Sequence, residues 1–477
     1  MKNIMKILGN IIGIISLLLV TYLLYLMVSI GFIPTKFLVI FGIIQYLFNL
    51  LFILFINKGK TTLKVISWIL LIIMIIGSSI GIYYLGSTNK FLDKAFNNAS
   101  GVHEVTYYVV TSKNSKYKDI DSLDKDVISY YKEEKNINKA LNKLRKKITY
   151  TKYGYDDISL MFDELKNNKS NSMLISRTYY DLVTTIDKEH SADNYKVLYK
   201  FSLKEKLNIK KSNNTNSFNI FIGGKDFTDT NMDFNMIVTI NTKTHKVLFT
   251  NIPRDYYMEV EGYDGKKDTL SYMGALGIDT NMKSIEKLFG IKFDYYLSVK
   301  TTSLVELVDA VGGINYCSDD EYTTTHAMVL GTYDDTKGKK LHVTKGCQHL
   351  NGIQTLTVAR ERLAHRGGDR KRQQNCQAII VDIFEQLVSA NTLTNYSSIL
   401  DSVSDFYETN IPREIMTSIV KDTVTNGNKW KFESQLVNGV DTQDYVHMTN
   451  LKDWVTYPDM LTVNAAVTKI NEVLENK

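Results

Sequence analysis

Three stretches of apolar residues open the chain and separate its first part from the rest. They run from about Ile7 to Ile33, from Phe37 to Ile56 and from Val65 to Leu85. Each has the roughly 20 residues that an α-helix needs to cross the hydrocarbon layer of a membrane. A cleavable signal peptide has a single short apolar core, so the pattern instead predicts a membrane anchor of three helices over residues 1–86.

Lysines in the short connections predict how these helices are oriented. Two flanks on the same side of the predicted membrane contain five of them: Lys2, Lys6, Lys58, Lys60 and Lys64. The flank on the other side contains only Lys36. Because lysine-rich flanks stay in the cytoplasm, three crossings place everything beyond residue 86 outside the bacterial cell membrane. This location excludes nucleic acid and cytoplasmic ATP as partners.

The remainder of the chain has the pattern of a soluble α/β protein. Four short apolar runs predict β-strands: Phe218 to Ile222, Asn235 to Ile240, Lys246 to Thr250, and Tyr295 to Val299. Leu304 to Val311 and Ile380 to Leu387 have apolar residues at helical spacing. Strands that alternate with helices predict a sheet covered by helices on its faces.

Changes in composition predict the domain boundaries. Residues 87–215 are rich in charged residues and tyrosine and predict an α+β accessory domain, which includes a charged helix from Val127 to Lys147. Lys210 to Ser217 lacks apolar residues and predicts a linker. The denser α/β domain then spans 216–390, and the pattern assigns no role to the extension over 391–477.

Overall charge and cysteine content add two constraints. A formal charge of +6 over 477 residues is too weak a bias to indicate nucleic-acid binding. Cys317, Cys347 and Cys376 have no CxxC spacing, which argues against a structural zinc site. Outside the membrane, Cys317 and Cys347 either form a disulfide or remain thiols, and the sequence leaves both open.

Polar side chains gather where the predicted strands end. They are Asp226, Asp233, Pro253-Arg254-Asp255, Arg360-Glu361-Arg362 and the segment 367–372. Sites in α/β sheets form at strand ends, so these residues are expected to converge. Carboxylates suit Mg²⁺ and arginines suit phosphate oxygens, so the combination predicts a pyrophosphate site with Mg²⁺ as cofactor.

Each of these clusters also has an ordinary structural explanation. Asp226 follows a Gly-Gly turn, Arg360 to Arg362 reads as a solvated face, and Asp369 to Arg372 reads as a helix cap with surface charges. The chain has no phosphate-binding loop of the Walker type, no nucleophile elbow and no HExxH motif. The site prediction therefore depends on the clusters acting together.

The stretch from Phe218 to Ala390 resembles the catalytic domain of the LytR-CpsA-Psr family. The matching segments are GGKD (223–226), MDFNMIVTIN (232–241), VLFTNIPRDYY (247–257), FDYYLSVKTTSLVELVDAVGGINY (293–316), KGCQHLNGIQTLTVARER (345–362) and GGDRKRQQNCQ (367–377). Three anchoring helices followed by an accessory domain are most similar to the capsule-linked CpsA branch of that family.

The resemblance implies an α/β/α sandwich with an apolar tunnel for a polyprenyl chain. It implies a Mg²⁺-dependent phosphotransferase that moves a polymer from polyprenyl (undecaprenyl) pyrophosphate to peptidoglycan and releases polyprenyl phosphate. The polymer class stays open between capsular polysaccharide and teichoic-acid-like chains. It also implies eight site residues, which are the magnesium-associated acids Asp226 and Asp233, the motif residues Arg254, Arg360, Arg362, Asp369 and Arg372, and Gln377.

Within that set, the resemblance implies catalytic roles for Asp233, Arg254, Arg362 and Asp369. Arg254 and Arg362 are also implied to bind pyrophosphate, together with the rest of the phosphate-binding set: Arg360, Arg372 and Gln377. Spacing alone does not decide whether Asp233 or Asp255 takes the proton of the acceptor hydroxyl.

Three positions depart from the family pattern: Asn231 stands at a usual arginine, Thr269 at a frequent lysine and Cys376 at one of two glutamines. A thiol cannot reproduce the donors and the strong acceptor of an amide. These departures keep open a non-catalytic protein that binds or senses lipid-linked polymer. A pyrophosphatase would use the same site with water. A DNA-binding attenuator, suggested by Arg366 to Arg372, is opposed by the predicted location and by the lack of a helix-turn-helix pattern.

Overall fold

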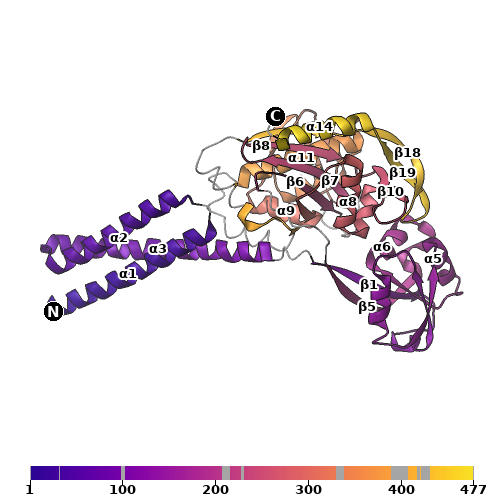
Figure 1. The fold of residues 1–477 in the computed structure, drawn as a ribbon, viewed down its shortest axis with the longest axis horizontal. Helices are drawn as coiled ribbons and strands as arrows, with labels where there is room; N and C mark the ends of the chain where they lie inside the picture. The colour runs from indigo at the N-terminus through magenta and orange to yellow at the C-terminus, as the bar shows by residue number, and fades with distance from the viewer. Residues whose placement is uncertain are drawn as a thin grey trace. The chain divides into compact units, whose positions relative to one another are not determined.

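The protein is described by a computed structural model, which covers nearly the whole chain (Figure 1). The described residues are 2–31, 33–97, 102–206, 215–226, 230–328, 338–387, 407–415, 419 and 430–475. Within them, residues 2–97 form one compact unit with part of 411–430, and the soluble α/β parts form a second. Each unit is described by itself.

The three apolar stretches are helices, as predicted. They are α1 (Lys2–Ile30), α2 (Thr35–Lys58) and α3 (Thr61–Asn97), and each contains a segment long and apolar enough to cross a membrane. The buried Asn49 side chain on α2 donates from Nδ2 to Ser16 Oγ on α1 at 2.7 Å. Such a hydrogen bond holds apolar helices together where their surfaces offer no other polar contact. The orientation in the membrane stays a prediction.

The accessory region is an α+β fold built on a five-stranded sheet. Its strands are β1 (Val102–Ser112), β2 (Asp126–Tyr131), β3 (Tyr150–Tyr155), β4 (Ser172–Ser176) and β5 (Tyr195–Lys206), in the order β3-β2-β4-β1-β5. Three helices pack on this sheet: α4 (Ile137–Leu144), α5 (Ile158–Lys166) and α6 (Arg177–Ile186). The predicted linker over Lys210 to Ser217 lies mostly outside the described residues.

The helix predicted from Val127 to Lys147 is wrong in its first half. Residues up to Tyr131 form β2, and only α4 is helical. Asn136, immediately before α4, has a left-handed backbone with φ 63°. A right-handed helix cannot continue through such a residue, so the chain must turn between the strand and the helix.

The α/β domain that follows the accessory region is built on a six-stranded sheet with the order β16-β11-β6-β7-β8-β17. The strands are β6 (Ser217–Lys225), β7 (Met232–Asn241), β8 (Lys246–Ile252), β11 (Tyr295–Lys300), β16 (Tyr407–Thr409) and β17 (Lys431–Leu436). β11 runs parallel to β6 and β17 parallel to β8, while the remaining pairs are antiparallel. All four strands predicted for this domain are confirmed.

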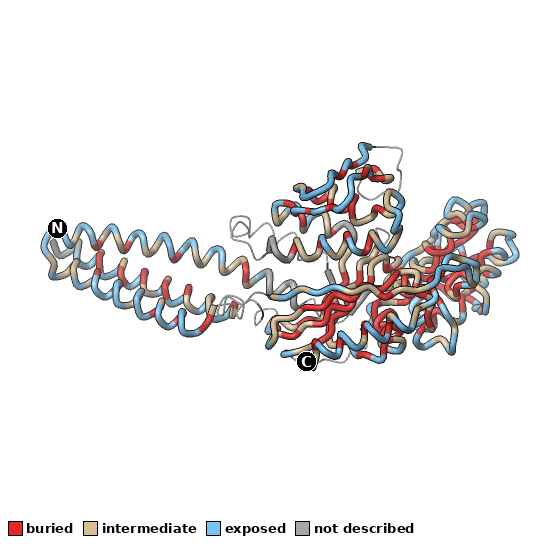
Figure 2. Tube along the Cα trace, turned by 90° about the horizontal axis from the view of Figure 1, so that it is seen from above, coloured by how far each residue is buried: buried red, intermediate tan, exposed pale blue. Residues whose placement is uncertain are grey.

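Helices cover both faces of this sheet, so the predicted α/β/α sandwich is confirmed. Leu248 and Ile252 on β8 pack in one hydrophobic cluster with α8 (Ile278–Phe289) and α14 (Met460–Glu475). The neighbouring Asn251 points to the opposite face, where its Nδ2 donates to Gln377 on α11 (Gly368–Leu387) at 2.8 Å. Figure 2 shows the strands as a buried layer with helices above and below it.

The sandwich continues beyond the predicted domain end at residue 390. β16 and β17 form the two edges of the sheet, and α14 packs against β6, β7 and β8. The sequence concealed these strands because β16 has three residues and β17 reads KFESQL, with few apolar positions. Short, half-exposed edge strands lack the apolar run by which a strand is recognised.

The open question about the cysteines is resolved by a disulfide between Cys317 and Cys347. The two residues are direct partners in the antiparallel ladder of β12 (Ile314–Ser318) and β15 (Gly346–Leu350). Cys376 on α11 is a free cysteine.

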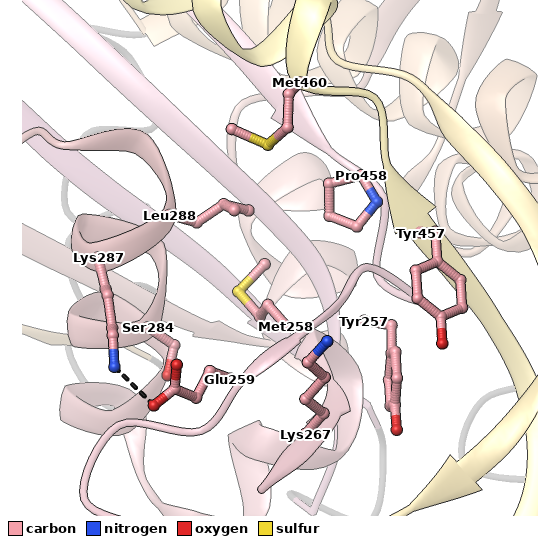
Figure 3. Close-up of a pocket in the computed structure, with 10 residues that line it drawn as sticks. All are labelled: Tyr257, Met258, Glu259, Lys267, Ser284, Lys287, Leu288, Tyr457, Pro458 and Met460. Carbon is pink, nitrogen blue, oxygen red and sulfur yellow. Dashed lines mark hydrogen bonds and ion pairs between the residues drawn. The ribbon is translucent and has the colours of Figure 1, made fainter. Parts of the chain in front are cut away.

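The domain also has two antiparallel hairpins. β9 (Tyr257–Glu259) and β10 (Lys267–Thr269) come after β8 in the chain, whereas β18 (Gly439–Val446) and β19 (Leu451–Pro458) come after β17. The Thr456 N–H donates to the Asp255 carbonyl at 2.7 Å. Arg370 Nη2 on α11 donates to the Gly439 carbonyl at 3.2 Å. The β18–β19 hairpin is thus attached where the predicted site residues lie, and Figure 3 shows the β9 and β19 segments near one another.

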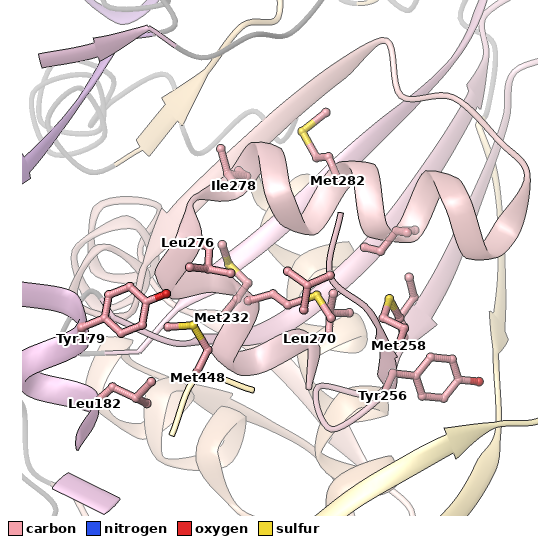
Figure 4. Packing of buried hydrophobic residues seen from close by; sticks show 14 of the residues in the cluster. Tyr179, Leu182, Met232, Tyr256, Met258, Leu270, Leu276, Ile278, Met282 and Met448 are labelled. Atoms are coloured by element: carbon pink, nitrogen blue, oxygen red, sulfur yellow. The ribbon is translucent and has the colours of Figure 1, made fainter. Parts of the chain in front are cut away.

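The accessory domain shares a hydrophobic core with the sandwich (Figure 4). Tyr179 and Leu182 on α6 belong to the same buried cluster as Leu276 and Met448 of the sandwich. Polar contacts continue this interface: Lys135 Nζ lies 3.1 Å from Asp279 Oδ2, and Lys266 forms an ion pair with Glu133. The two domains therefore form one compact unit.

The Asp268 carboxyl is buried where β10 meets the β18–β19 hairpin. Burial raises its pKa to about 7, although backbone N–H groups of Met448 and Thr269 donate to its two oxygens at 2.6 and 2.7 Å. The folded protein therefore binds this proton more tightly than the unfolded chain does. The resulting stabilisation is complete below pH ~4 and is lost as the pH rises through about 7, and its upper bound is roughly 4 kcal/mol.

Asp268→Asn is expected to remove this pH dependence, because the amide stays neutral. At pH 5 the variant should be less stable than the wild type, since it loses one acceptor for a backbone N–H. The difference in stability should become smaller as the pH rises toward 8, because the wild type loses stability there. Thermal unfolding of the full chain followed by circular dichroism at both pH values measures the difference. Asp319→Asn, at a side chain that is 96% exposed, is the control. An unchanged difference between the two pH values would contradict the assignment.

Candidate functional site

Five of the predicted site residues come together at the end of the sheet where β8 stops. They are Asp233 on β7, Arg254 after β8, Arg362 after α10 (Gly352–Arg360), and Asp369 and Arg372 in the first turns of α11. β7 and β8 are antiparallel neighbours, so the start of one strand lies beside the end of the other. This register explains why an acid and an arginine 21 positions apart meet.

Asp233 and Arg254 form the central ion pair. Arg254 Nη1 donates to Asp233 Oδ1 at 2.7 Å, and Arg254 Nε lies 3.3 Å from Asp255 Oδ1. Ser271 holds both members, because its Oγ donates to Asp233 Oδ1 at 3.3 Å and its N–H donates to the Arg254 carbonyl at 2.7 Å. The pair is consequently fixed by the short helix α7 (Leu270–Met273).

Arg372 and Asp369 form a second ion pair and join it to the first. Arg372 Nε donates to Asp369 Oδ1 at 2.7 Å, and Gln373 Nε2 donates to Asp369 Oδ2 at 2.9 Å. Arg372 Nη2 also donates to the Asp233 carbonyl at 3.0 Å. The first turn of α11 is therefore bound directly to the start of β7.

Arg362 completes a cluster of three guanidinium groups. Burial and the positive charges of Arg254 and Arg372 lower its pKa below the ordinary arginine value, against the opposing effect of Asp369 and Asp233. Among the described residues, no carboxylate lies within ion-pair distance of Arg362. A half-buried cation that is repelled by two others favours an anionic ligand.

The three acids of the cluster differ in their pKa. Burial opposes the charges of Asp233 and Asp369, but the neighbouring arginines outweigh it and lower the pKa of both carboxyls. Burial raises the pKa of Asp255 more than Arg254 lowers it, and the negative charges of Asp369 and Asp233 add to the rise. Asp255 is therefore the acid of the cluster whose charged form is least stabilised.

The other three predicted residues have different surroundings. Arg360 is the last residue of α10, two positions before Arg362. Gln377 lies on α11 and accepts from Asn251 at 2.8 Å. Asp226 lies just after β6, where its Oδ1 accepts from the backbone N–H groups of Thr230 and Asn231 at 3.0 and 3.3 Å.

The carboxylate oxygens of Asp226 and Asp233 are ligands of the type that Mg²⁺ prefers. Asp226 is 7% exposed, and the buried Asn231 Oδ1 has no hydrogen-bond partner among the described residues. No group of three or more His, Cys, Asp or Glu residues able to hold a metal occurs in the described ranges. Mg²⁺ typically takes one or two carboxylates together with substrate phosphates, so Asp226 and Asp233 match that ion in the type of ligand.

Sequence reasoning missed two residues that position the site. Glu361 was read as part of a solvated face, but it is fully buried and accepts hydrogen bonds from Thr325 and from the Ala364 N–H at 2.9 Å. It thereby fixes the backbone between Arg360 and Arg362. Ser271 belongs to none of the sequence motifs. The only signal near it is Thr269, two positions earlier, which departs from the family pattern.

Cys376 is the free thiol that departs from the family pattern. Its Sγ donates to the Ala359 carbonyl at 3.3 Å. Burial raises the pKa of the thiol to about 11, so it stays protonated at neutral pH. A neutral thiol bound to a backbone carbonyl is a poor nucleophile, which agrees with a structural residue.

Comparisons with known proteins identify the family to which this chain is similar. The profile of the LytR_cpsA_psr family matches residues 176–457. A polyisoprenyl-teichoic acid–peptidoglycan teichoic acid transferase TagU of Bacillus cereus (strain AH820) is 29% identical over 188 residues, which cover 39% of this chain and 57% of the relative. A TagU of Enterococcus faecalis (strain ATCC 700802 / V583) is 28% identical over 254 residues, covering 52% of this chain and 76% of the relative.

Similar folds occur among solved structures. Protein gbs0355 of Streptococcus agalactiae has a TM-score of 0.46 and 24% identity, covering 55% of this chain and 89% of that one. TagV of B. subtilis has a TM-score of 0.44 and 22% identity, covering 55% of this chain and 98% of that one.

Proposed function

Since the chain belongs to the LytR_cpsA_psr family, we propose that it attaches a polyprenyl-pyrophosphate-linked glycopolymer to peptidoglycan and releases polyprenyl phosphate. The names of the TagU relatives support a wall polymer such as teichoic acid as the class of cargo. The three apolar helices support a membrane anchor, which keeps the enzyme beside a donor that never leaves the bilayer. The positive-inside rule supports an extracytoplasmic catalytic domain.

The observation that carries this proposal is the cluster of Arg254, Arg362 and Arg372. Two of the three are paired with carboxylates, whereas the positive charges of Arg254 and Arg372 affect the pKa of Arg362 more than the carboxylates of Asp369 and Asp233 do. A pyrophosphate supplies the missing negative charge, and the planar guanidinium fork donates two hydrogen bonds to phosphate oxygens. Positioning and neutralisation of charge are the main contributions that a protein makes to phosphoryl transfer.

The chemistry follows from this arrangement. An acceptor sugar hydroxyl attacks the phosphorus that carries the polymer, and a new P–O bond forms. The bond from that phosphorus to the bridging oxygen breaks, so polyprenyl phosphate leaves with the bridging oxygen. Arg254, Arg362 and Arg372 stabilise the charge that develops, while Asp233 and Asp369 orient two of these arginines. No covalent intermediate with the protein is needed.

Asp255 is the residue that we assign to take the proton of the attacking hydroxyl. Asp233 and Asp369 are engaged by arginines that lower their pKa and make them weak bases. The pKa of Asp255 is raised by burial, which makes it the stronger base. When bound, Mg²⁺ would be held by Asp226 and Asp233 and would neutralise phosphate charge. The tunnel for the polyprenyl chain remains a prediction.

A non-catalytic protein that binds lipid-linked polymer is the alternative. The Cys376 departure supports it, because this thiol donates to a backbone carbonyl and offers no amide to a ligand. Such a protein would need the same arginine cluster but no proton acceptor. Turnover therefore separates the two functions.

Reconstitution of the full-length protein in detergent micelles tests the proposal. With a lipid-pyrophosphate-linked polymer, peptidoglycan fragments and Mg²⁺, we expect polyprenyl phosphate to be released and polymer to become attached to the fragments. Chelation by EDTA should slow both, and omission of the fragments should stop attachment. Binding of the donor without release would favour the alternative, whereas release without attachment would indicate a pyrophosphatase.

A further inference from the structure

A cavity of about 320 Å³ lies beside the site and has no role in the chemistry described above (Figure 3). It is a half-open pocket lined by residues of β9, β10, α8 and the corner where β19 passes into α14. Tyr257, the first residue of β9, lines it and follows Asp255 by two positions. The volume falls at the low end of the range of about 300–1,000 Å³ that is usual for small-ligand sites.

Two tyrosines form the aromatic wall of this cavity. The ring centroids of Tyr257 and Tyr457 are 5.3 Å apart, with the ring planes at 65°. Both hydroxyls are held, because Tyr257 donates to the Tyr445 carbonyl at 2.8 Å and Tyr457 donates to Asp444 Oδ2 at 2.5 Å. The rings are therefore oriented before any ligand arrives, which lowers the entropic cost of binding.

The polar groups of the cavity leave one cation available. Lys287 is paired with Glu259 at 2.6 Å. Lys267 Nζ lies 5.8 Å from the centroid of the Tyr257 ring, and among the described residues no carboxylate lies within ion-pair distance of it. The lining thus combines aromatic faces with a hydrogen-bonding rim and one lysine, Lys267, whose charge Glu259 and Asp444 affect only from beyond ion-pair distance.

We propose that this cavity binds one or two sugar units that carry an acidic group. A sugar ring has an apolar C–H face, which suits a tyrosine ring, and a rim of hydroxyls, which suits lysine and carboxylate side chains. The acidic group would pair with Lys267. The pocket lies close to the backbone of Asp255, since Thr456, the neighbour of Tyr457 on β19, donates to the Asp255 carbonyl at 2.7 Å.

This inference rests on the proposed function, because both substrates of that reaction are glycans. An acidic sugar at this place comes either from the peptidoglycan acceptor, through the lactyl carboxylate of a muramic acid residue without a stem peptide, or from the transferred polymer. The chemistry of recognition is the same for both sources. Binding of each source by itself, without turnover, distinguishes them.

The test measures binding to the full-length protein in detergent by titration calorimetry. The probes are a muramyl disaccharide, a lipid-free fragment of the wall polymer, and chitobiose as a neutral disaccharide. Tyr457→Ala is expected to weaken binding of the acidic probe by ~tenfold or more through loss of the aromatic contact. Lys267→Gln should weaken the acidic probe by a similar factor and leave chitobiose unchanged.

Trp454→Ala is the matched control. This side chain is 62% exposed on the same strand, three positions before Tyr457, and an odd spacing places it on the other face of the hairpin. Tyr457→Phe keeps the ring and should bind within a few-fold of the wild type, which separates loss of the aromatic face from loss of folding.

The outcomes separate this inference from the proposed function. Transfer without any effect of Tyr457→Ala or Lys267→Gln on binding would overturn the sugar site and leave the transferase intact. Binding that depends on both residues, without release of polyprenyl phosphate, would support the site and contradict the transferase. No binding of either acidic probe by the wild type at millimolar concentration would also overturn the inference.

Discussion

Replacement of Arg362 by alanine is expected to lower the rate of polymer transfer by ~10²–10³-fold while the protein still folds and inserts. Within the arginine cluster, Arg362 is the guanidinium without a carboxylate partner among the described residues, so its charge is the one that the proposed pyrophosphate would neutralise. Its removal abolishes its own repulsion with Arg254 and Arg372, so the variant should not lose thermal stability. The kcat for release of polyprenyl phosphate measures the effect.

Arg366→Ala is the matched control for this variant, because the side chain is exposed and lies on the same segment. Arg254→Ala is a useful contrast. It leaves Asp233 without its 2.7 Å partner and is expected to cost stability as well as activity. Arg362→Lys should recover only part of the rate, since an ammonium keeps the charge but loses the planar fork. A wild-type rate for Arg362→Ala would refute the pyrophosphate site.

Replacement of Asp255 by asparagine is expected to slow transfer by ~10²–10⁴-fold, the usual contribution of a general base. A base acts only when deprotonated, so the wild-type kcat should fall as the pH drops through the pKa of Asp255. Burial raises that pKa above the ordinary aspartate value, so the fall should begin at a higher pH than for a solvated carboxylate. In Asp255→Asn this acidic limb should be absent.

Asp233→Asn tests which of the two acids, Asp233 or Asp255, takes the proton of the acceptor hydroxyl, a choice that residue spacing left open. Its loss should reduce the rate by releasing Arg254, yet the acidic limb of the pH profile should remain, because Asp255 is still present. The pH dependence of kcat for both variants, measured under saturating donor, gives the comparison. Disappearance of the limb in Asp233→Asn and its persistence in Asp255→Asn would reverse the assignment.

The sequence predicted the residues of the site better than their partners. Arg254 and Arg372 were placed at strand and helix ends by local pattern and by family motifs, and the structure brings them together. The pairing of Arg254 with Asp233, and of Arg372 with both Asp369 and the Asp233 carbonyl, depends on the strand register. Register is a tertiary property that residue spacing does not contain.

Other features were hidden because long-range burial creates them. Glu361 was interpreted as a surface charge, but it is buried and accepts a hydrogen bond from the Thr325 hydroxyl, which lies 36 positions away in the sequence. The raised pKa of Asp255 arises from burial and from two acids on different elements, Asp369 on α11 and Asp233 on β7. The tyrosine cavity joins β9 with β19, which are 200 residues apart for Tyr257 and Tyr457. Local periodicity carries none of this information.

The placement of β16 and β17 at the two margins of the sheet constrains how the molecule is made. β7, which bears Asp233, and β8, which Arg254 follows, leave the ribosome long before the two segments that pair with the edges of the sheet. Until then, β11 and β8 have unpaired backbone N–H and C=O groups, with which strands of other chains can form hydrogen bonds. A chain that ends before β16 and β17 would keep these two edges unpaired and would be prone to aggregate, so the sheet is protected only once both late segments have been made.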